Sequence, residues 1–160
     1  MSEPVFRAPM RARDREVEPG AGAAFGLARG LVGIGDRLDG VPATLEDAVA
    51  AAVRRSGAKA GRMLRRFAEL PEGSLVWTRD GDGRLWLGRI AGPWRYEDDA
   101  AARAVGLHHV RATTWQERPV GEDDAPAAVL ATFARGGRNL QRIRDARAER
   151  ETARLWAAGR

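Results

Sequence analysis

Cysteine is absent from the 160 residues of this chain, so neither disulfides nor thiolate metal sites can hold its fold. No apolar run approaches the length that a bilayer requires, and the N-terminal stretch MSEPVFRAPMRARDREVEPG lacks the apolar centre of a secretory signal. These absences predict a soluble, cytoplasmic protein without a membrane anchor. We expect it to be bacterial and to hold no metal and no cofactor. Its stability must come from packing.

Catalytic groups are scarce as well. The three serines, Ser2, Ser56 and Ser74, lie outside any G-x-S-x-G nucleophile motif. His108 and His109 are neighbours in a predicted strand, so we expect their rings on opposite faces, where they cannot act on one substrate atom. The stretch ARGLVGIGDRLDG contains G-x-G but lacks the third glycine and the helix of a dinucleotide-binding fingerprint. We therefore predict no catalytic residue and no enzymatic activity.

Lysine is nearly absent too, because Lys59 is the only one, while the formal net charge is +5. The basic side chains are therefore almost all arginines, which bind phosphate in a fork and stack on flat rings. This balance suits DNA or RNA as the partner. The codon usage of a GC-rich genome would give the same excess of arginine, alanine and glycine, so the charge alone leaves both explanations open.

The sequence pattern divides the chain into three parts. Residues 1–22 mix proline, glycine and charges of both signs without periodicity, which predicts a flexible arm that carries no core. Residues 23–143 form the predicted folded domain, with a first strand in FGLARGLVGIGD from Phe25 onward. Residues 144–160 are rich in helix formers and predict a partly buried C-terminal helix.

Three helices are expected inside the folded domain. Thr44 opens TLEDAVAAAVRRS as N-cap, with Asp47 three positions later. The segment AGRMLRRFAEL predicts a second helix that ends before Pro71, and DDAPAAVLATFA a third with Asp124 as N-cap.

Short β-rich runs occupy the middle of the chain. SLVWT and LWLGRIA are joined by RDGDGR, whose Asp-Gly pairs favour a tight hairpin, and HHVRATTW predicts a further strand after the acidic loop EDDAAARAVGL. The order of strand, helices, hairpin, strand and helix leaves little room for a parallel β-α-β sheet. We predict an α+β fold: a small, twisted β-barrel of five or six strands flanked by helices.

Aromatic residues gather in this middle region. Four of the five tryptophans, Trp77, Trp86, Trp94 and Trp115, lie there with Tyr96. Core filling is an alternative explanation for each ring, because small barrels need large side chains. Trp94 and Tyr96 stand in GPWRYEDD, after the strand, which places them at the barrel mouth where two rings can stack on an extruded base.

A resemblance to a known family is carried by GSLVWTRDGDGRLWLGRIAGPWRY followed by HHVRATTW. This succession resembles EVE-like modules of the PUA/YTH/ASCH superfamily, where G-D-x-V, G-x-I-x-G, Y-x-Y and H-x-R-x-V-x-W motifs follow one another. The resemblance covers roughly residues 25–143. It implies a five- or six-stranded barrel with a shallow cavity for a modified or flipped base in DNA or RNA. Relatives are often fused to nucleases in bacterial modification-dependent defence.

The matching positions define the expected site. Trp94 and Tyr96 match the aromatic turn, Arg111 and Trp115 match the later strand, and residues 32–36 match the first pocket-lining strand. Asp36 stands where many relatives have an aromatic residue, so it either accepts hydrogen bonds from a base edge or is an ordinary turn residue. The predicted base pocket consists of Trp94, Tyr96, Asp36, Trp77 and Trp115. The predicted phosphate contacts are Arg89, Arg95 and Arg111.

The sequence is also compatible with two other functions. The same barrel with a filled cavity would be a protein-interaction domain that docks a partner through the C-terminal helix and Trp156. A small hydrolase would need a buried acid or base beside Lys59 or Glu69, which the sequence does not display. If the protein binds nucleic acid, a partner protein would have to supply any cleavage of that nucleic acid.

Overall fold

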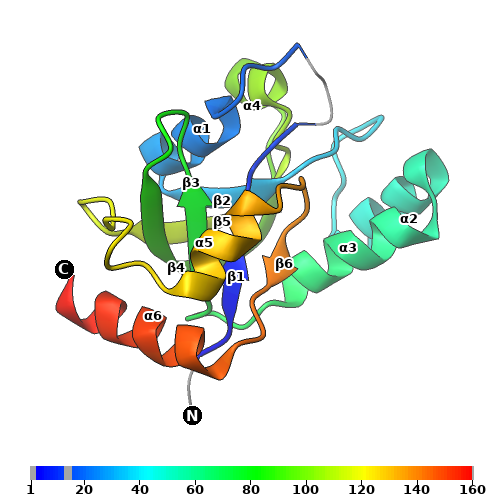
Figure 1. Cartoon of the computed structure of the whole chain (residues 1–160). Coiled ribbons are helices and arrows are strands. Elements are labelled where there is room, and N and C mark those ends of the chain that lie inside the picture. The colour runs from blue at the N-terminus through cyan, green and yellow to red at the C-terminus, as the bar shows by residue number, and fades with distance from the viewer. Residues whose placement is uncertain (1–2, 13–15, 160) are drawn as a thin grey trace.

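The computed structural model describes residues 3–12 and 16–159. Their core is one curled sheet of six strands in the order β2-β5-β4-β3-β1-β6 (Figure 1). The strands are β1 (Val5–Arg7), β2 (Leu31–Ile34), β3 (Leu75–Arg79), β4 (Leu85–Tyr96), β5 (His109–Trp115) and β6 (Gln141–Arg142). The helices are α1 (Ala21–Arg29), α2 (Leu45–Ser56), α3 (Ala58–Glu69), α4 (Ala100–Val105), α5 (Ala127–Ala134) and α6 (Ala146–Ala158).

The predicted α+β fold, a small, twisted β-barrel of five or six strands flanked by helices, is confirmed, and the structure forms it as a curled, six-stranded half-barrel sheet. Neighbouring strands pair antiparallel, except that β1 runs parallel to β3. The strands β2 and β6 remain at the two edges. No helix in the described ranges has the length and apolar character needed to cross a bilayer.

Local signals place several elements correctly. The hydroxyl of Thr44 accepts a hydrogen bond from the amide of Asp47, so α2 begins where the capping pattern predicts. The helix α3 and the β3–β4 hairpin also match their predicted segments. The predicted N-cap Asp124 is wrong, because α5 starts behind Pro126 without a side-chain cap. The amide of Asp124 instead bonds the carbonyl of Gly121 in the preceding turn.

The predicted flexible arm is the main correction. Residues 5–7 form β1, which lies between β3 and β6, and Val5 is fully buried. Met10 is also buried in the core. A strand of three residues is too short to show an alternation of apolar and polar side chains in the sequence. Its burial depends on pairing with strands that are distant in the sequence. Residues 13–15, in the middle of the predicted arm, are outside the described part.

The first predicted strand is half helix. The residues from Phe25 to Arg29 belong to α1, and the chain becomes extended only at Leu31. The glycines of α1 serve close packing, because a Cβ atom at Gly22 would lie 1.8 Å from the carbonyl oxygen of Met10. Tertiary contact thus outweighs the low helix propensity of glycine.

The expected acidic loop also contains a helix. Asp99 caps α4 by accepting a hydrogen bond from the amide of Ala102 at 2.8 Å. This helix covers the same side of the sheet as α1, and Ala102 is fully buried there.

Two apolar clusters cover opposite faces of the sheet. Val76, Ile90 and Val110 belong to the cluster under α1, α3 and α4. Leu75 and Trp77 alternate with Val76 along β3 and face the other cluster, under α5 and α6. The C-terminal helix α6 is therefore part of the packed body, and its apolar residues include Ala148, Leu155 and Trp156.

Candidate nucleic-acid interface

A cavity of about 120 Å³ opens where β2 ends against the α2–α3 hairpin. The segments 8–11 and 138–140 complete its wall. Its apolar lining includes Met10, Ile34, Leu38, Met63, Leu64 and Leu107. Its polar and charged lining includes Asp36, His109, Asn139, Arg11, Arg55 and Arg138. A cavity of roughly 150 Å³ is known to hold a benzene molecule, so this one is the size of a single flat ring.

Small residues keep the cavity open. A Cβ atom at Gly33 would lie 3.0 Å from the carbonyl oxygen of His109, and one at Gly35 would lie 3.0 Å from that of Gly106. These glycines let β2 and the following turn lie close to the segment that leads into β5. Ala52 of α2 and Ala60 of α3 line the opposite wall with methyl groups only.

His109 forms the inner wall and has a defined tautomer. Its Nδ1 accepts a hydrogen bond from Nε1 of Trp94 at 3.2 Å, because an indole nitrogen can only donate. Burial lowers the pKa of His109 to about 4, although a hydrogen bond with the backbone of Asp36 opposes this shift. The ring is therefore neutral at pH 7, and Nε2 carries its proton.

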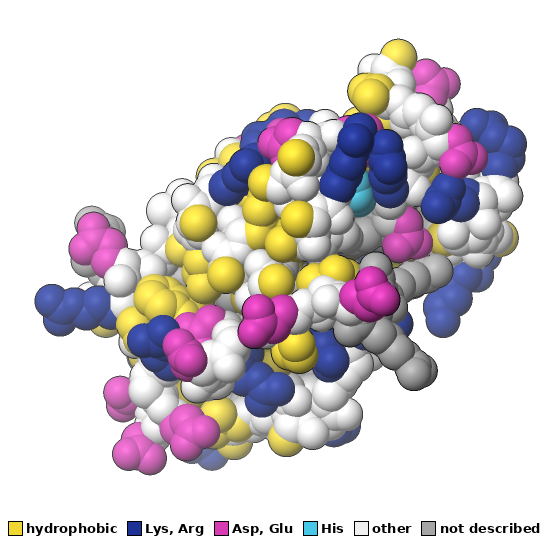
Figure 2. Space-filling view, turned by 90° about the horizontal axis from the view of Figure 1, so that it is seen from above, with side chains coloured by type: hydrophobic (Ala, Val, Ile, Leu, Met, Phe, Trp, Pro, Cys, Tyr) yellow, Lys and Arg dark blue, Asp and Glu magenta, His cyan; other side chains and the backbone are white. Residues whose placement is uncertain are grey.

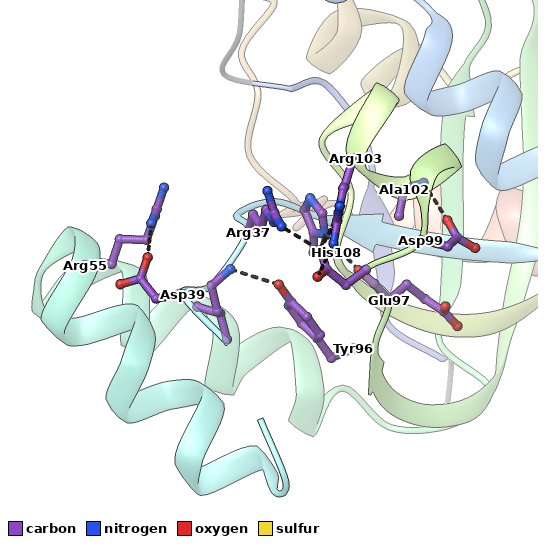
Figure 3. Close-up of polar contacts among 11 residues, drawn as sticks. Arg37, Asp39, Arg55, Tyr96, Glu97, Asp99, Ala102, Arg103 and His108 are labelled. Carbon is purple, nitrogen blue, oxygen red and sulfur yellow. Dashed lines mark hydrogen bonds and ion pairs between the residues drawn. The ribbon is translucent and has the colours of Figure 1, made fainter. Parts of the chain in front are cut away.

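Tyr96 connects the sheet to the helical hairpin. Its hydroxyl accepts a hydrogen bond from the amide of Leu38 at 2.9 Å, in the loop that precedes α2 (Figure 3). Its ring lies against both His108 and His109, at centroid distances of 5.7 and 5.4 Å. Burial is the largest cause of the raised pKa of Tyr96. The two histidine rings thus contact the same side chain, which corrects the expectation that the sheet separates them.

The structure places Trp94 and Tyr96 inside β4 and not in a loop beyond it. The pairing of β4 with β5 shifts between Ile90 and Trp94, and after the shift Trp94 lies opposite Arg111. A bulge at this point changes the direction of the side chains that follow. Both rings are half-buried and pack behind His109, and neither lines the cavity. The two predicted rings thus lie beside the cavity and support its wall, but they do not line it.

The two remaining predicted tryptophans lie elsewhere. Trp77 is completely buried on the face covered by α6, where its Nε1 donates to the hydroxyl of Thr152. It is a core residue and cannot line an open pocket. Trp115 donates its Nε1 to the carbonyl of Leu31 at 3.2 Å, and its ring covers Gly88, where a Cβ atom would lie 2.5 Å from the ring.

The predicted phosphate contacts are engaged within the protein. Arg111 is buried, and its guanidinium donates to the carbonyls of Gly92, Phe67 and Leu70, the last two at the end of α3. Burial lowers its pKa, with an opposing effect of Glu72. Arg111 is therefore a structural cap that phosphate does not reach. Arg89 and Arg95 are paired with Glu3 and Glu97, and neither lines the cavity.

Three other arginines, Arg11, Arg55 and Arg138, line the cavity instead. Arg55 follows Ala52 by one helical turn, so helical spacing could have indicated that they share a face. Nothing in the sequence brings residues 11 and 138 together. Arg55 forms an exposed ion pair with Asp39 at 2.6 Å, and such a pair adds little stability, so a phosphate can compete for the guanidinium (Figure 3).

One face of the molecule has mixed charge. Dark blue and magenta side chains alternate over much of the view in Figure 2, so basic side chains do not form one continuous sheet on this face. Within residues 3–12 and 16–159, no three His, Cys, Asp or Glu side chains are grouped as potential metal ligands.

No family model and no curated protein matches the chain. Among solved structures, the chain is similar to the YTH domain of the Zygosaccharomyces rouxii MRB1 protein, crystallised in complex with N6-methyladenosine RNA. The two share 12% sequence identity with a TM-score of 0.44, over 99% of this chain and 89% of the YTH chain.

Proposed function

We propose that this protein is a non-enzymatic, cytoplasmic nucleic-acid-binding module that takes one base, unmodified or modified, into the cavity beside β2. The proposal follows the resemblance of the sequence to EVE-like modules. In such a role it would serve bacterial modification-dependent defence as a reader, and a partner protein would supply any cleavage.

The observation that carries the proposal is the combination of size, lining and charge in one hollow. Its volume of about 120 Å³ suits one flat ring, and Met63, Ile34 and Leu107 offer apolar contact to the faces of that ring. Asp36 and Asn139 supply polar groups that can read a base edge. The arginines in the lining, Arg11, Arg55 and Arg138, can hold the adjoining phosphates in charge-assisted hydrogen bonds.

In this proposal the aromatic residues have a positioning role. Trp94 fixes the tautomer of His109 through its Nε1, and Tyr96 fixes the backbone at Leu38 through its hydroxyl. Both contacts hold groups that line the cavity. In this proposal aliphatic and methionine side chains contact the base, and no aromatic cage surrounds it.

A cavity-filling substitution tests the base site. Ala60→Phe places a large ring into the cavity from α3, whereas Ala58→Phe adds the same ring at an exposed position of the same helix. We expect Ala60→Phe to weaken binding of single-stranded oligonucleotides by at least about tenfold, because the anchoring pocket is lost. Ala58→Phe should bind as the wild type does. Fluorescence anisotropy with matched DNA and RNA strands, with and without base methylation, measures both. Unchanged binding by Ala60→Phe would contradict the proposal.

A pair of neighbouring arginines tests the rim. Arg55 lines the cavity, while Arg54 is exposed on the same helix and lies outside the lining. Arg55→Ala should lower the slope of log K against log[salt] by about 0.7 on a single strand, because one phosphate contact is lost. Arg54→Ala removes the same charge and should leave the slope nearly unchanged. Equal slopes for the two variants would show that only overall charge matters.

A further inference from the structure

A second hollow adjoins the cavity beside β2. It has a volume of about 350 Å³, and both hollows include Pro9 and Arg11 in their lining. We call it the Arg79 groove, because Arg79 at the end of β3 forms part of its wall. Its other lining residues include Arg7, Asp80, Phe133, Gly136 and Gly137. The segment around Pro9 therefore separates two neighbouring hollows and contributes to both.

Arg7, which lines this groove, is a buried arginine. It is 6% exposed, and its Nη1 donates hydrogen bonds to the carbonyls of Thr132 and Gly136 at 2.9 and 2.7 Å. Nε donates to the carbonyl of Asn139. Among the residues that the structure describes, Nη2 has no hydrogen-bond partner and no carboxylate forms an ion pair with Arg7. A buried guanidinium without a counter-ion is costly, and an anion in the groove would relieve that cost.

The remaining charges of the groove also favour an anion. The guanidinium of Arg79 lies 5.6 Å from the centre of the Phe133 ring and makes no ion pair with any described residue. The carboxylate in the lining, Asp80, is already engaged with the side chains of Arg84 and Trp86. Burial is the largest cause of the lowered pKa of Arg7, and the positive charge of Arg135 nearby adds to it.

We infer that the Arg79 groove binds the phosphate next to the base held in the cavity, so that the ligand is a single strand of at least two nucleotides. The inference rests on the proposed function. Arg11 lies between the two hollows and can contact a strand that passes from one to the other. The groove is lined by Arg7, Arg11 and Arg79, and guanidinium groups match the oxygens of a phosphodiester. The groove thus defines the path of the backbone, which the base cavity alone leaves open.

The test compares nucleosides with dinucleotides that contain one phosphodiester. The wild type should bind a dinucleotide at least about tenfold more tightly than the same nucleoside, as measured by calorimetry, because charge-assisted hydrogen bonds are added. Arg79→Glu should remove this advantage and leave nucleoside binding unchanged. Arg118→Glu is the matched control, because Arg118 is exposed and lines neither hollow. Arg7 is not a suitable target, since its carbonyl contacts hold the end of α5.

The outcomes separate this inference from the proposed function. If Arg79→Glu keeps the dinucleotide advantage while Ala60→Phe loses binding, the groove is not a phosphate site and the base cavity stands. If Ala60→Phe retains full binding, the proposed function fails, and with it the claim that one strand occupies both hollows. If Arg118→Glu loses as much as Arg79→Glu, the effect is one of overall charge and the inference fails. Arg79→Gln, which keeps the shape of the side chain, should give an intermediate loss and unchanged thermal unfolding.

Discussion

Two regions of this protein differ in packing. The sheet is tightly packed under α5 and α6, whereas a cavity lies between β2 and the α2–α3 hairpin. Under α5 and α6, Trp77, Leu75 and Leu87 are almost entirely buried against the helices, and the hydroxyl of Thr152 accepts a hydrogen bond from the indole of Trp77. The α2–α3 hairpin packs mainly on itself and projects from the body (Figure 1). Between this hairpin and β2 lies the cavity in which we propose that a base binds. The region that stabilises the fold and the region where we propose binding are thus different parts of one sheet.

The largest effect is expected on the filled side. Trp77→Ala should lower the free energy of unfolding by about 3 to 5 kcal/mol, because it removes a fully buried indole and leaves a cavity. Trp94→Ala should cost clearly less, since Trp94 is half-buried. Urea denaturation measures both variants. If the two substitutions cost the same, the contrast between the filled and the hollow region is wrong.

An acid-dependent loss of stability is expected from the hollow side. The pKa of His109 is lowered to about 4 in the folded protein by burial, while the unfolded chain has an ordinary value near 6.5. Between these values the unfolded chain binds one more proton, so stability is complete above about pH 6.5 and falls as the pH drops. The loss should reach about 3 kcal/mol near pH 4, at 1.36 kcal/mol for each pKa unit.

The control for this pH dependence is His109→Gln, which cannot titrate. Urea denaturation between pH 7 and pH 4 should show a reduced slope in this variant. The lowered pKa values of Glu46, Asp80, Asp98 and Asp99 also reduce stability as the pH falls below about 5, but they do so in both proteins, so the difference between the two slopes reports His109. An equal slope in the wild type and the variant would show that His109 does not remain neutral when buried.

Local signals explain the parts of the fold that the sequence predicts well. Thr44 with its capping partner defines the start of α2, and the Asp-Gly repeats define the β3–β4 turn, because both depend on neighbouring residues only. The strand β1 and the helix α1 are different, since Val5 is buried by distant strands and Gly22 by the backbone at Met10. Propensity gives no indication of such contacts.

The lining of the candidate site differs from the residues that the sequence predicts. The sequence points to Trp94, Tyr96 and Asp36, and the structure places Asp36 in the cavity wall with the two rings behind it. The basic residues differ more, because Arg111 is a buried cap while Arg11 reaches the rim from the segment after β1. Whether an arginine faces solvent or a helix end depends on tertiary structure, which its spacing along the chain does not reveal.

The smallest effect compares two helix caps, one in each region. Thr44 caps α2 and Asp145 caps α6, each accepting a hydrogen bond from the amide three positions later. Replacing either with alanine should cost about 1 kcal/mol. Because α2 packs mainly on α3, Thr44→Ala should speed hydrogen exchange within α2 and α3 and leave the central strands protected. Asp145→Ala should weaken protection of the whole sheet, since α6 belongs to the cluster around Trp77. Uniform loss of protection in Thr44→Ala would mean that the hairpin does not open separately, and that the cavity wall is as firmly held as the filled side.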